Sequence, residues 1–227
     1  PNGRIHYMKT IYTRDLRGRV ISCSREVDGV SLPVVTYSYD DLGRLIFKSA
    51  DSRMNEFYIY DIHGWETVRV AEYAGSHVFS QTLSYASSST SGVPSLYSGL
   101  ISESVSSHNG QQSQTYGYRY DSGARLVDAV HLVGTSSSLV NTEKDITYDL
   151  NGNIKTIKRY DASALADNLS YTYSGNRLTS VTDAVESSSY TYTYDEAGNM
   201  TSDTGKGHVR AYNVLNLPHS VTTGNGK

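Results

Sequence analysis

The feature that most constrains this chain is a short phrase that recurs along it, in which tyrosines at alternate positions precede an aspartate and then a glycine. The clearest copy is YTYTYDEAGNM, residues 190–200. Because alternate side chains of an extended chain point to opposite faces, the three tyrosines share one face of a predicted strand and the threonines the other. Asp195 ends this strand, since its carboxylate can accept a nearby backbone N–H, and Gly198 can take the positive φ of a type I turn with a bulge. The phrase therefore predicts half of a β-hairpin.

The same order of residues recurs at intervals that suit one hairpin each. Tyr39 and Tyr60 are 21 residues apart, whereas Tyr120 and Tyr148 are 28 apart. Some copies are imperfect, because Gly123 lies one place early and Ser174 replaces the aspartate in a shortened turn. The predicted structural motif residues are Asp15, Gly18, Arg19, Tyr39, Asp40, Gly43, Arg44, Tyr60, Asp61, Gly64, Tyr120, Asp121, Arg125, Tyr148, Asp149, Gly152, Tyr173, Arg177, Tyr194, Asp195 and Gly198. A period of this kind is the signature of a repeat array.

The interval between Tyr60 and Tyr120 has room for two further units. Tyr85 and Tyr97 are the candidates for their tyrosines. We favour Tyr97, because the Ser-Gly-Leu that follows it resembles the shortened turn after Tyr173.

At these residues the chain resembles the YD repeat of Rhs proteins, Y-D-x-x-G-R/N-L, which also occurs in bacterial insecticidal toxin complexes and in teneurins. The resemblance covers nearly the whole chain, from Tyr12 to Thr223. It implies an all-β fold of tandem antiparallel β-hairpins that form part of a spiralling β-sheet shell. In toxin members such a shell encloses a cytotoxic segment, and in teneurins it is an extracellular adhesion module. The D-P-x-G self-cleavage motif of Rhs proteins has no counterpart here, so neither a plug nor a toxin is carried over.

We expect one array over residues 1–227, with about eight to ten hairpin units and longer Ser-rich loops near 84–95 and 106–115. Residues 161–169 are compatible with one or two helical turns or with a loop. The sequence opens inside a strand pattern, so we expect it to be a piece of a longer protein. The hairpins at its two ends are then expected either to fray or to dock on another copy through open sheet edges, and we favour docking.

Composition excludes several classes of partner. The formal net charge is −3 without a run of like charges, which argues against nucleic acid. No apolar run approaches the roughly 20 residues that span a membrane, so we expect no membrane insertion. Few aliphatic residues beside 20 tyrosines suit a thin wall, because tyrosine combines an apolar ring with a polar end.

Each short motif that could indicate catalysis or metal binding has a simpler explanation. Asp203-Thr204-Gly205 matches the aspartic-protease tripeptide but is expected to be a turn. Residues 149–153 resemble a calcium loop only faintly, since the glycine stands too early and no glutamate follows. The seven histidines lack the spacing of a zinc site. We therefore expect no catalytic residues, no cofactor and no metal, and we do not expect an enzyme.

Two hypotheses for function remain. The first is a non-catalytic segment of a YD-repeat shell that encapsulates or presents a toxin or effector encoded elsewhere in its parent, so that its partners are the rest of the shell and the enclosed effector. The second is a cell-surface adhesion or carbohydrate-binding module that presents exposed tyrosines to glycans. The resemblance implies a secreted or cell-surface protein in either case. Wall tyrosines such as Tyr39, Tyr60, Tyr148 and Tyr194 are expected to be mostly buried against their equivalents in adjacent hairpins, and Asp40 and Arg44 to pair across their turn.

Overall fold

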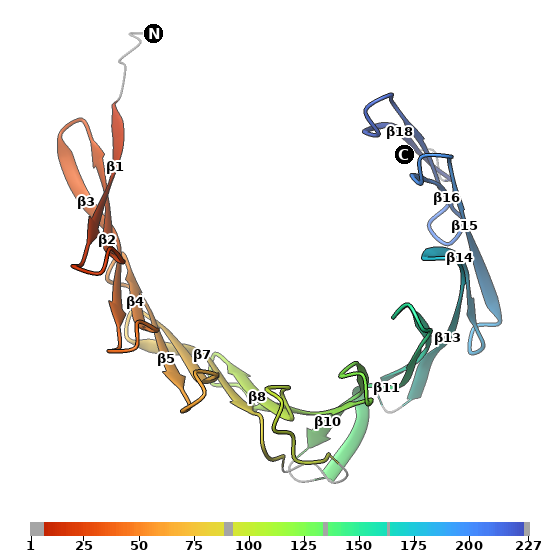
Figure 1. Ribbon diagram of the computed structural model, residues 1–227, viewed down its shortest axis with the longest axis horizontal. Coiled ribbons are helices and arrows are strands. Elements are labelled where there is room, and N and C mark those ends of the chain that lie inside the picture. The colour runs from red at the N-terminus through yellow and green to blue at the C-terminus, as the bar shows by residue number, and fades with distance from the viewer. Residues whose placement is uncertain (1–6, 89–92, 134–135, 163, 225–227) are drawn as a thin grey trace. The chain divides into compact units, whose positions relative to one another are not determined.

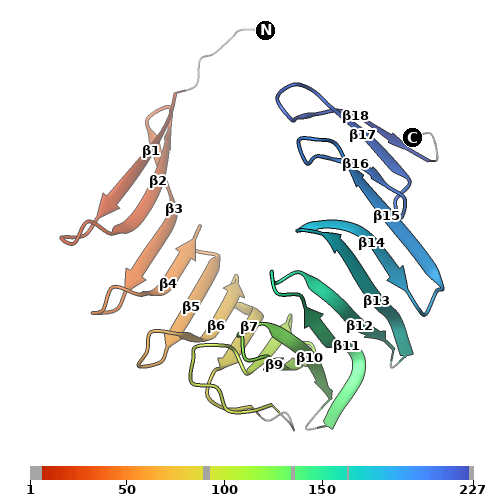
Figure 2. The same ribbon diagram turned by 45° about the vertical axis from the view of Figure 1, so that its right-hand side comes forward.

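Antiparallel strands make up nearly all of the ordered structure. A computed structural model describes residues 7–88, 93–133, 136–162 and 164–224. The chain divides into two compact units, residues 1–116 and 117–227. Within each unit, consecutive strands pair side by side in chain order (Figures 1 and 2). The described ranges contain no helix, so the all-β prediction is confirmed, and no helix among them is long and apolar enough to cross a membrane.

The strands differ in length from four to thirteen residues. Those of the first unit are β1 (Met8–Arg14), β2 (Val20–Val27), β3 (Val30–Tyr39), β4 (Leu45–Ala50), β5 (Met54–Tyr60), β6 (Glu66–Tyr73), β7 (Ser76–Ser84) and β8 (Glu103–His108). β9 (Gln114–Tyr120) lies across the division between the units. Those of the second unit are β10 (Leu126–Val133), β11 (Ser136–Tyr148), β12 (Ile154–Asp161), β13 (Ala164–Ser174), β14 (Arg177–Asp183), β15 (Ser188–Tyr194), β16 (Met200–Asp203), β17 (His208–Tyr212) and β18 (Pro218–Thr223).

One end of most hairpins is closed by the Asp-x-x-Gly phrase. Between β3 and β4, the Gly43 N–H donates to the Asp40 carbonyl at 3.0 Å, and the Asp40 N–H donates to the Arg44 carbonyl at 2.9 Å. The strand register shifts between Ser38 and Tyr39, which marks a β-bulge, and Gly43 has a φ of 89°. This is the type I turn with a bulge that the sequence predicts. Equivalent turns begin at Asp15, Asp61, Asp149 and Asp195, as expected.

The opposite end of several hairpins is closed by a different turn, which the sequence reasoning missed. Asp28 and Gly29, between β2 and β3, have φ values of 51° and 82°. Ala74 and Gly75, between β6 and β7, have φ values of 49° and 77°. Two central residues with positive φ are typical of the type I′ turn, whose twist matches that of the flanking strands. From β1 to β7 the chain therefore alternates between two kinds of turn.

The two faces of a strand differ as the period of two predicts. In β15 the three tyrosines are half-buried, whereas Thr191 and Thr193 are exposed. On the exposed face the hydroxyls of Thr193 and Thr201 lie 2.9 Å apart, across β15 and β16. Tyrosine thus lies on the half-buried face and threonine on the exposed face, where pairs of threonine hydroxyls add cross-strand contacts to the backbone hydrogen bonds.

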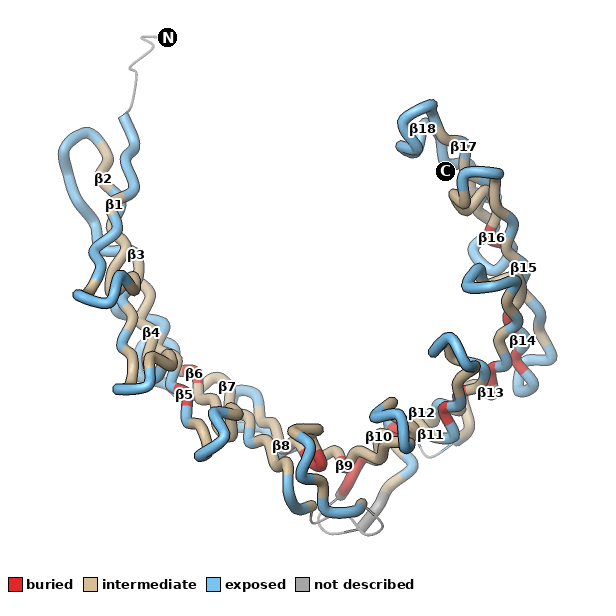
Figure 3. The backbone as a smooth tube through the Cα atoms, in the orientation of Figure 1, coloured by how far each residue is buried: buried red, intermediate tan, exposed pale blue. Residues whose placement is uncertain are grey.

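The apolar core is thin. In the second unit, Ile146, Ile157, Leu169 and Val181, one from each of β11 to β14, form a buried cluster, and Leu132 of β10 is also buried. The buried stretches of the chain are correspondingly short, while the turns are exposed (Figure 3). Each strand therefore contributes little apolar burial of its own, and its stability depends on the neighbouring strands.

The structure differs from the expectation at residues 161–169, whereas the long loop expected near 84–95 falls in the long connection between β7 and β8. Residues 161–169 form neither a helix nor a loop, because a tight turn at Ala162, with a φ of 44°, joins β12 directly to β13. Leu169 is only 7% exposed in β13. This burial favours a strand, although the residues that precede Leu169 are also compatible with a helix. Residues 84–95 begin the long connection from β7 to β8, of which 89–92 lie outside the described residues. Of residues 106–115, only 109–113 connect strands.

Candidate functional site

The recurring turn is held by its own aspartate. The Asp40 Oδ1 accepts the Arg44 backbone N–H at 2.8 Å, and its Oδ2 accepts Arg44 Nε at 2.6 Å. Burial raises the pKa of this carboxyl, but the hydrogen bonds from Arg44 outweigh it and leave the pKa below its usual value. The expected ion pair across the turn is therefore present.

The same contact recurs in other turns. Arg19 pairs with Asp15 and Arg125 with Asp121, each at 2.7 Å. The Asp121 pKa is lowered chiefly by the hydrogen bond from the Arg125 side chain. Backbone N–H groups four residues on donate to the Oδ1 of Asp15, Asp40, Asp61, Asp121, Asp149 and Asp195.

The arginine of one turn also holds the tyrosine of the next repeat. The guanidinium of Arg44 lies over the Tyr60 ring, with 4.9 Å between Cζ and the ring centroid. The Tyr60 hydroxyl donates back to the Leu45 carbonyl at 2.8 Å, and Arg44 Nη1 donates to the Asp61 carbonyl at 3.0 Å. We call this set of contacts the inter-repeat clasp. In it, the arginine guanidinium of one repeat lies over the tyrosine ring of the next, and that tyrosine's hydroxyl donates to the carbonyl of the residue after the arginine.

The clasp is repeated in both units. Arginine lies over tyrosine in the pairs Arg19 with Tyr39, Arg125 with Tyr148, and, at a longer 5.9 Å, Arg177 with Tyr194. The hydroxyl contact recurs from Tyr39 to Val20, Tyr85 to Glu66, Tyr148 to Leu126, Tyr173 to Ile154 and Tyr212 to Met200. At these places a repeat is tied to the one before it.

Two expectations about the tyrosines are wrong in their detail. Tyr39, Tyr60, Tyr148 and Tyr194 are half-buried rather than mostly buried, because the sheet of each unit covers them with neighbouring strands and an arginine but with no second layer of strands among the described residues. Their rings meet the preceding guanidinium rather than the equivalent tyrosine. Tyr120, at the end of β9, is also half-buried, and burial raises its pKa.

Asparagine replaces arginine in two copies and makes a neutral form of the contact. The Asn199 Nδ2 donates to Asp195 Oδ2 at 2.9 Å and to Asn216 Oδ1 at 3.0 Å. Asn153 likewise bridges Asp149 and Asn176. The link to the next turn is therefore kept without a cation.

The left-handed backbone of these turns favours glycine. Gly18, Gly43, Gly64, Gly152 and Gly198 all have positive φ. At Gly198, a Cβ would also lie 3.0 Å from Nη2 of Arg177. In the copy whose glycine lies one place early, Ala124 takes the left-handed position, with a φ of 62°. An alanine there is strained by roughly 1 kcal/mol.

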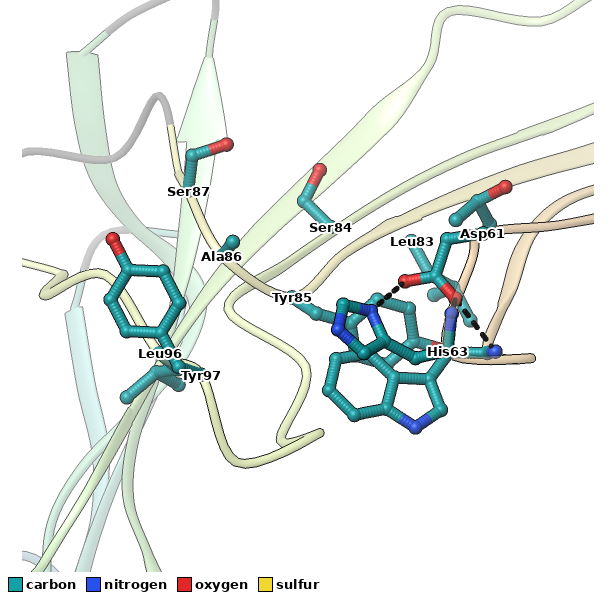
Figure 4. Close-up of a pocket in the computed structure, with 11 residues that line it drawn as sticks. Asp61, His63, Leu83, Ser84, Tyr85, Ala86, Ser87, Leu96 and Tyr97 are labelled. Atoms are coloured by element: carbon teal, nitrogen blue, oxygen red, sulfur yellow. Dashed lines mark hydrogen bonds and ion pairs between the residues drawn. The ribbon is translucent and has the colours of Figure 1, made fainter.

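An aromatic recess marks the one aspartate turn that departs from this pattern. Trp65 stands where arginine or asparagine is found in the other aspartate turns, with the His63 ring stacked on it at 4.6 Å and the Tyr85 ring at 5.0 Å. These rings, Asp61 and the chain that follows β7 line a recess of about 290 Å³, with Tyr97 on its other side (Figure 4). The Asp61 Oδ2 lies 3.2 Å from His63 Nδ1.

This region also corrects the choice between the two candidate tyrosines. Tyr85 donates its hydroxyl to the Glu66 carbonyl as the motif tyrosines do, whereas Tyr97 is 82% exposed. The turn after Tyr97 misled the prediction, because Gly99 is needed for another reason: a Cβ there would lie 2.9 Å from the Trp65 ring. The alternation of Leu83 and Tyr85, which is typical of a strand that ends in a motif tyrosine, could have identified Tyr85 from the sequence.

The remaining sequence candidates lie in structural positions. Asp203 is buried, and its Oδ1 accepts the Lys206 N–H within the turn between β16 and β17. Within the described ranges, no group of three or more His, Cys, Asp or Glu side chains could hold a metal ion.

Comparison with known proteins agrees with the repeated geometry. Residues 171–209, which contain the Tyr173 and Tyr194 copies, match the sequence model of a family described as RHS Repeat. No curated protein matches the chain.

Solved structures share the fold over most of the chain. A crystal structure of TcdB2-TccC3 matches with a TM-score of 0.64 and 14% identity, over 94% of this chain and 14% of that one. A mutant Photorhabdus luminescens Tc holotoxin pore matches with a TM-score of 0.55 and 12% identity, over 96% of this chain and 14% of that one. The fold is therefore shared with these structures, and this chain spans 14% of their length.

Proposed function

We propose that this chain is a non-catalytic wall segment of an RHS-repeat shell, which encloses or presents an effector encoded elsewhere in the parent protein. The observation that carries the proposal is the inter-repeat clasp. Every clasp uses side chains of one repeat to hold the next, as in Arg44 with Tyr60 and Arg125 with Tyr148. A contact that recurs from repeat to repeat serves to extend a wall, whereas a catalytic site is normally built once.

Exposed aliphatic residues at the turn tips support a place within a larger assembly. Leu16, Ile62 and Leu150, each directly after a motif aspartate, are 108%, 95% and 105% exposed. Leu42 occupies a neighbouring position and is 77% exposed. Repeated apolar tips of this kind indicate a contact surface, and the rest of the parent shell is the partner that the repeat implies.

The proposal includes the organisation and location expected from the sequence. Both units belong to one array of hairpins, and the parent protein is secreted or displayed at the cell surface. A glycan platform is less well supported, because Tyr39, Tyr60 and Tyr148 are half-buried, each with an arginine over its ring and its hydroxyl on a main-chain carbonyl. Little of such a ring is left for a sugar.

Limited proteolysis of the full-length protein that contains this chain tests the proposal. If the chain walls off an effector, the effector region resists a protease that degrades the same region produced alone. Tyr60→Ala combined with Tyr148→Ala should open the wall and speed this cleavage. Tyr12→Ala, at a tyrosine that is 60% exposed, is the matched control and should leave protection unchanged. Equal cleavage of the effector region inside and outside the intact protein would refute the proposal.

A further inference from the structure

The turn at Asp61 lacks the side-chain partner that the other aspartate turns have. In the turns at Asp15, Asp40, Asp121, Asp149 and Asp195, the residue four places on is Arg or Asn and donates a side-chain N–H to Oδ2. Trp65 occupies that position after Asp61. Its side chain carries no cation, and the polar neighbour of Asp61 Oδ2 is His63, whose ring is 58% exposed.

The recess beside Trp65 differs from its counterpart earlier in the first unit. The counterpart, between the turns at Asp15 and Asp40, has the same volume of about 290 Å³ and contains two arginines. Arg19 lies over Tyr39, and Arg17 Nη1 donates to the Asp41 carbonyl at 2.8 Å. The residues that line the Trp65 recess include neither Arg nor Lys. The Trp65 recess thus has a carboxylate, as its counterpart does, but no guanidinium among the described residues that line it.

Aromatic rings and hydroxyls form the rest of this recess. Figure 4 shows the His63 and Tyr85 rings on one side and Tyr97 on the other. The Trp65 ring packs against His63 and Tyr85, and Ser84 and Ser87 also line the recess. Aromatic faces attract cations, and a carboxylate in the same site adds charge-assisted hydrogen bonding.

We propose that the Trp65 recess binds a guanidinium group in trans, which takes the place of the arginine that this turn lacks. The group is presented by an arginine side chain of another polypeptide or by a small guanidinium compound. Asp61 Oδ2 accepts its N–H donors, and the aromatic rings contact its flat face. A volume of about 290 Å³ lies at the lower end of ligand sites, which run from about 300 Å³ upward. It suits one side chain rather than an oligosaccharide.

Tryptophan fluorescence of the whole chain tests the proposal directly, because Trp65 is the single tryptophan. The probes are N-acetyl-L-arginine amide, methylguanidinium and the citrulline counterpart of the first, a neutral isostere, at about pH 8, where an ordinary imidazole is uncharged. We expect saturable binding of both guanidinium probes and at least about tenfold weaker binding of the citrulline compound. Tighter binding of the arginine amide than of methylguanidinium would indicate a peptide source, and equal binding a small molecule; both support the recess as a guanidinium site. Equal binding of the citrulline compound, or no binding of either guanidinium probe, would overturn the proposal.

Two variants locate the site, with circular dichroism to verify that each is folded. Asp61→Asn keeps an oxygen for the turn but removes the charge, and should weaken guanidinium binding about tenfold or more. Trp65→Arg supplies the missing guanidinium within the chain and should abolish binding measured by calorimetry. Asp149→Asn, in a turn of the second unit, is the matched control and should bind as the unsubstituted chain does. Undiminished binding by folded Asp61→Asn or Trp65→Arg would place the probe elsewhere and contradict the proposal.

Discussion

Replacement of Tyr148 separates the two halves of the inter-repeat clasp. Tyr148→Phe removes only the hydroxyl, which donates to the Leu126 carbonyl at 2.6 Å. A hydrogen bond of this kind contributes about 1 kcal/mol net. Tyr148→Ala also removes a half-buried ring that packs on the Ile146 cluster under Arg125. Since truncation of a fully buried aromatic costs about 3–5 kcal/mol, a loss of roughly half that size, about 1.5–2.5 kcal/mol, is expected here.

Urea unfolding followed by far-ultraviolet circular dichroism measures both losses. Tyr12→Ala is the control, because Tyr12 is 60% exposed and its loss should stay within about 0.5 kcal/mol. Hydrogen exchange at the amides of β10 and β11 then checks that the loss is local to the clasp. If Tyr148→Phe unfolds at the urea concentration of the unsubstituted chain and Tyr148→Ala resembles Tyr12→Ala, the clasp does not stabilise the array.

Three further predictions follow from the turns and the core. Ala124→Gly should stabilise the second unit by about 0.5–1 kcal/mol in urea unfolding, because it relieves a left-handed alanine, while Gly152→Ala should destabilise by about 1 kcal/mol. The Asp121 pKa is lowered in the folded chain, so the ionised carboxylate stabilises the fold above the ordinary carboxyl pKa, and this stabilisation is lost as the pH falls below about 4. Asp121→Asn should therefore flatten the pH dependence of the urea midpoint in that range. Leu169→Ala should cost about 2–4 kcal/mol, whereas Leu150→Ser at an exposed tip should cost less than about 0.5 kcal/mol in thermal or urea unfolding.

Local chemistry explains why so much of the fold could be predicted from the sequence. The alternation in β15 sets its two faces, and Asp40 with Gly43 sets a turn, since both effects act within a few residues. The ion pair of Asp40 with Arg44 is likewise a contact within one turn.

Contacts between repeats could not be predicted in the same way. That Arg44 lies over Tyr60 depends on the register of β4, β5 and β6 and on the twist between them, which a period in the sequence does not specify. The choice of Tyr97 over Tyr85 failed for this reason, because a glycine that looked like part of a turn is required by the Trp65 ring. The recess around Trp65 arises from the same kind of contact. Self-association through sheet edges stays a prediction, which light scattering over a concentration series tests.

A double-mutant cycle on Arg44 and Tyr60 tests the central claim most directly, namely that the arginine of a motif turn ties its repeat to the next. The single changes Arg44→Ala and Tyr60→Ala and their combination are compared by the free energy of unfolding, beside a second cycle that pairs Arg44 with Tyr39 of its own hairpin. The clasp predicts a coupling of about 0.5–1 kcal/mol between Arg44 and Tyr60 and a smaller one between Arg44 and Tyr39. Additive losses at Arg44 and Tyr60, or equal coupling in the two cycles, would contradict the claim.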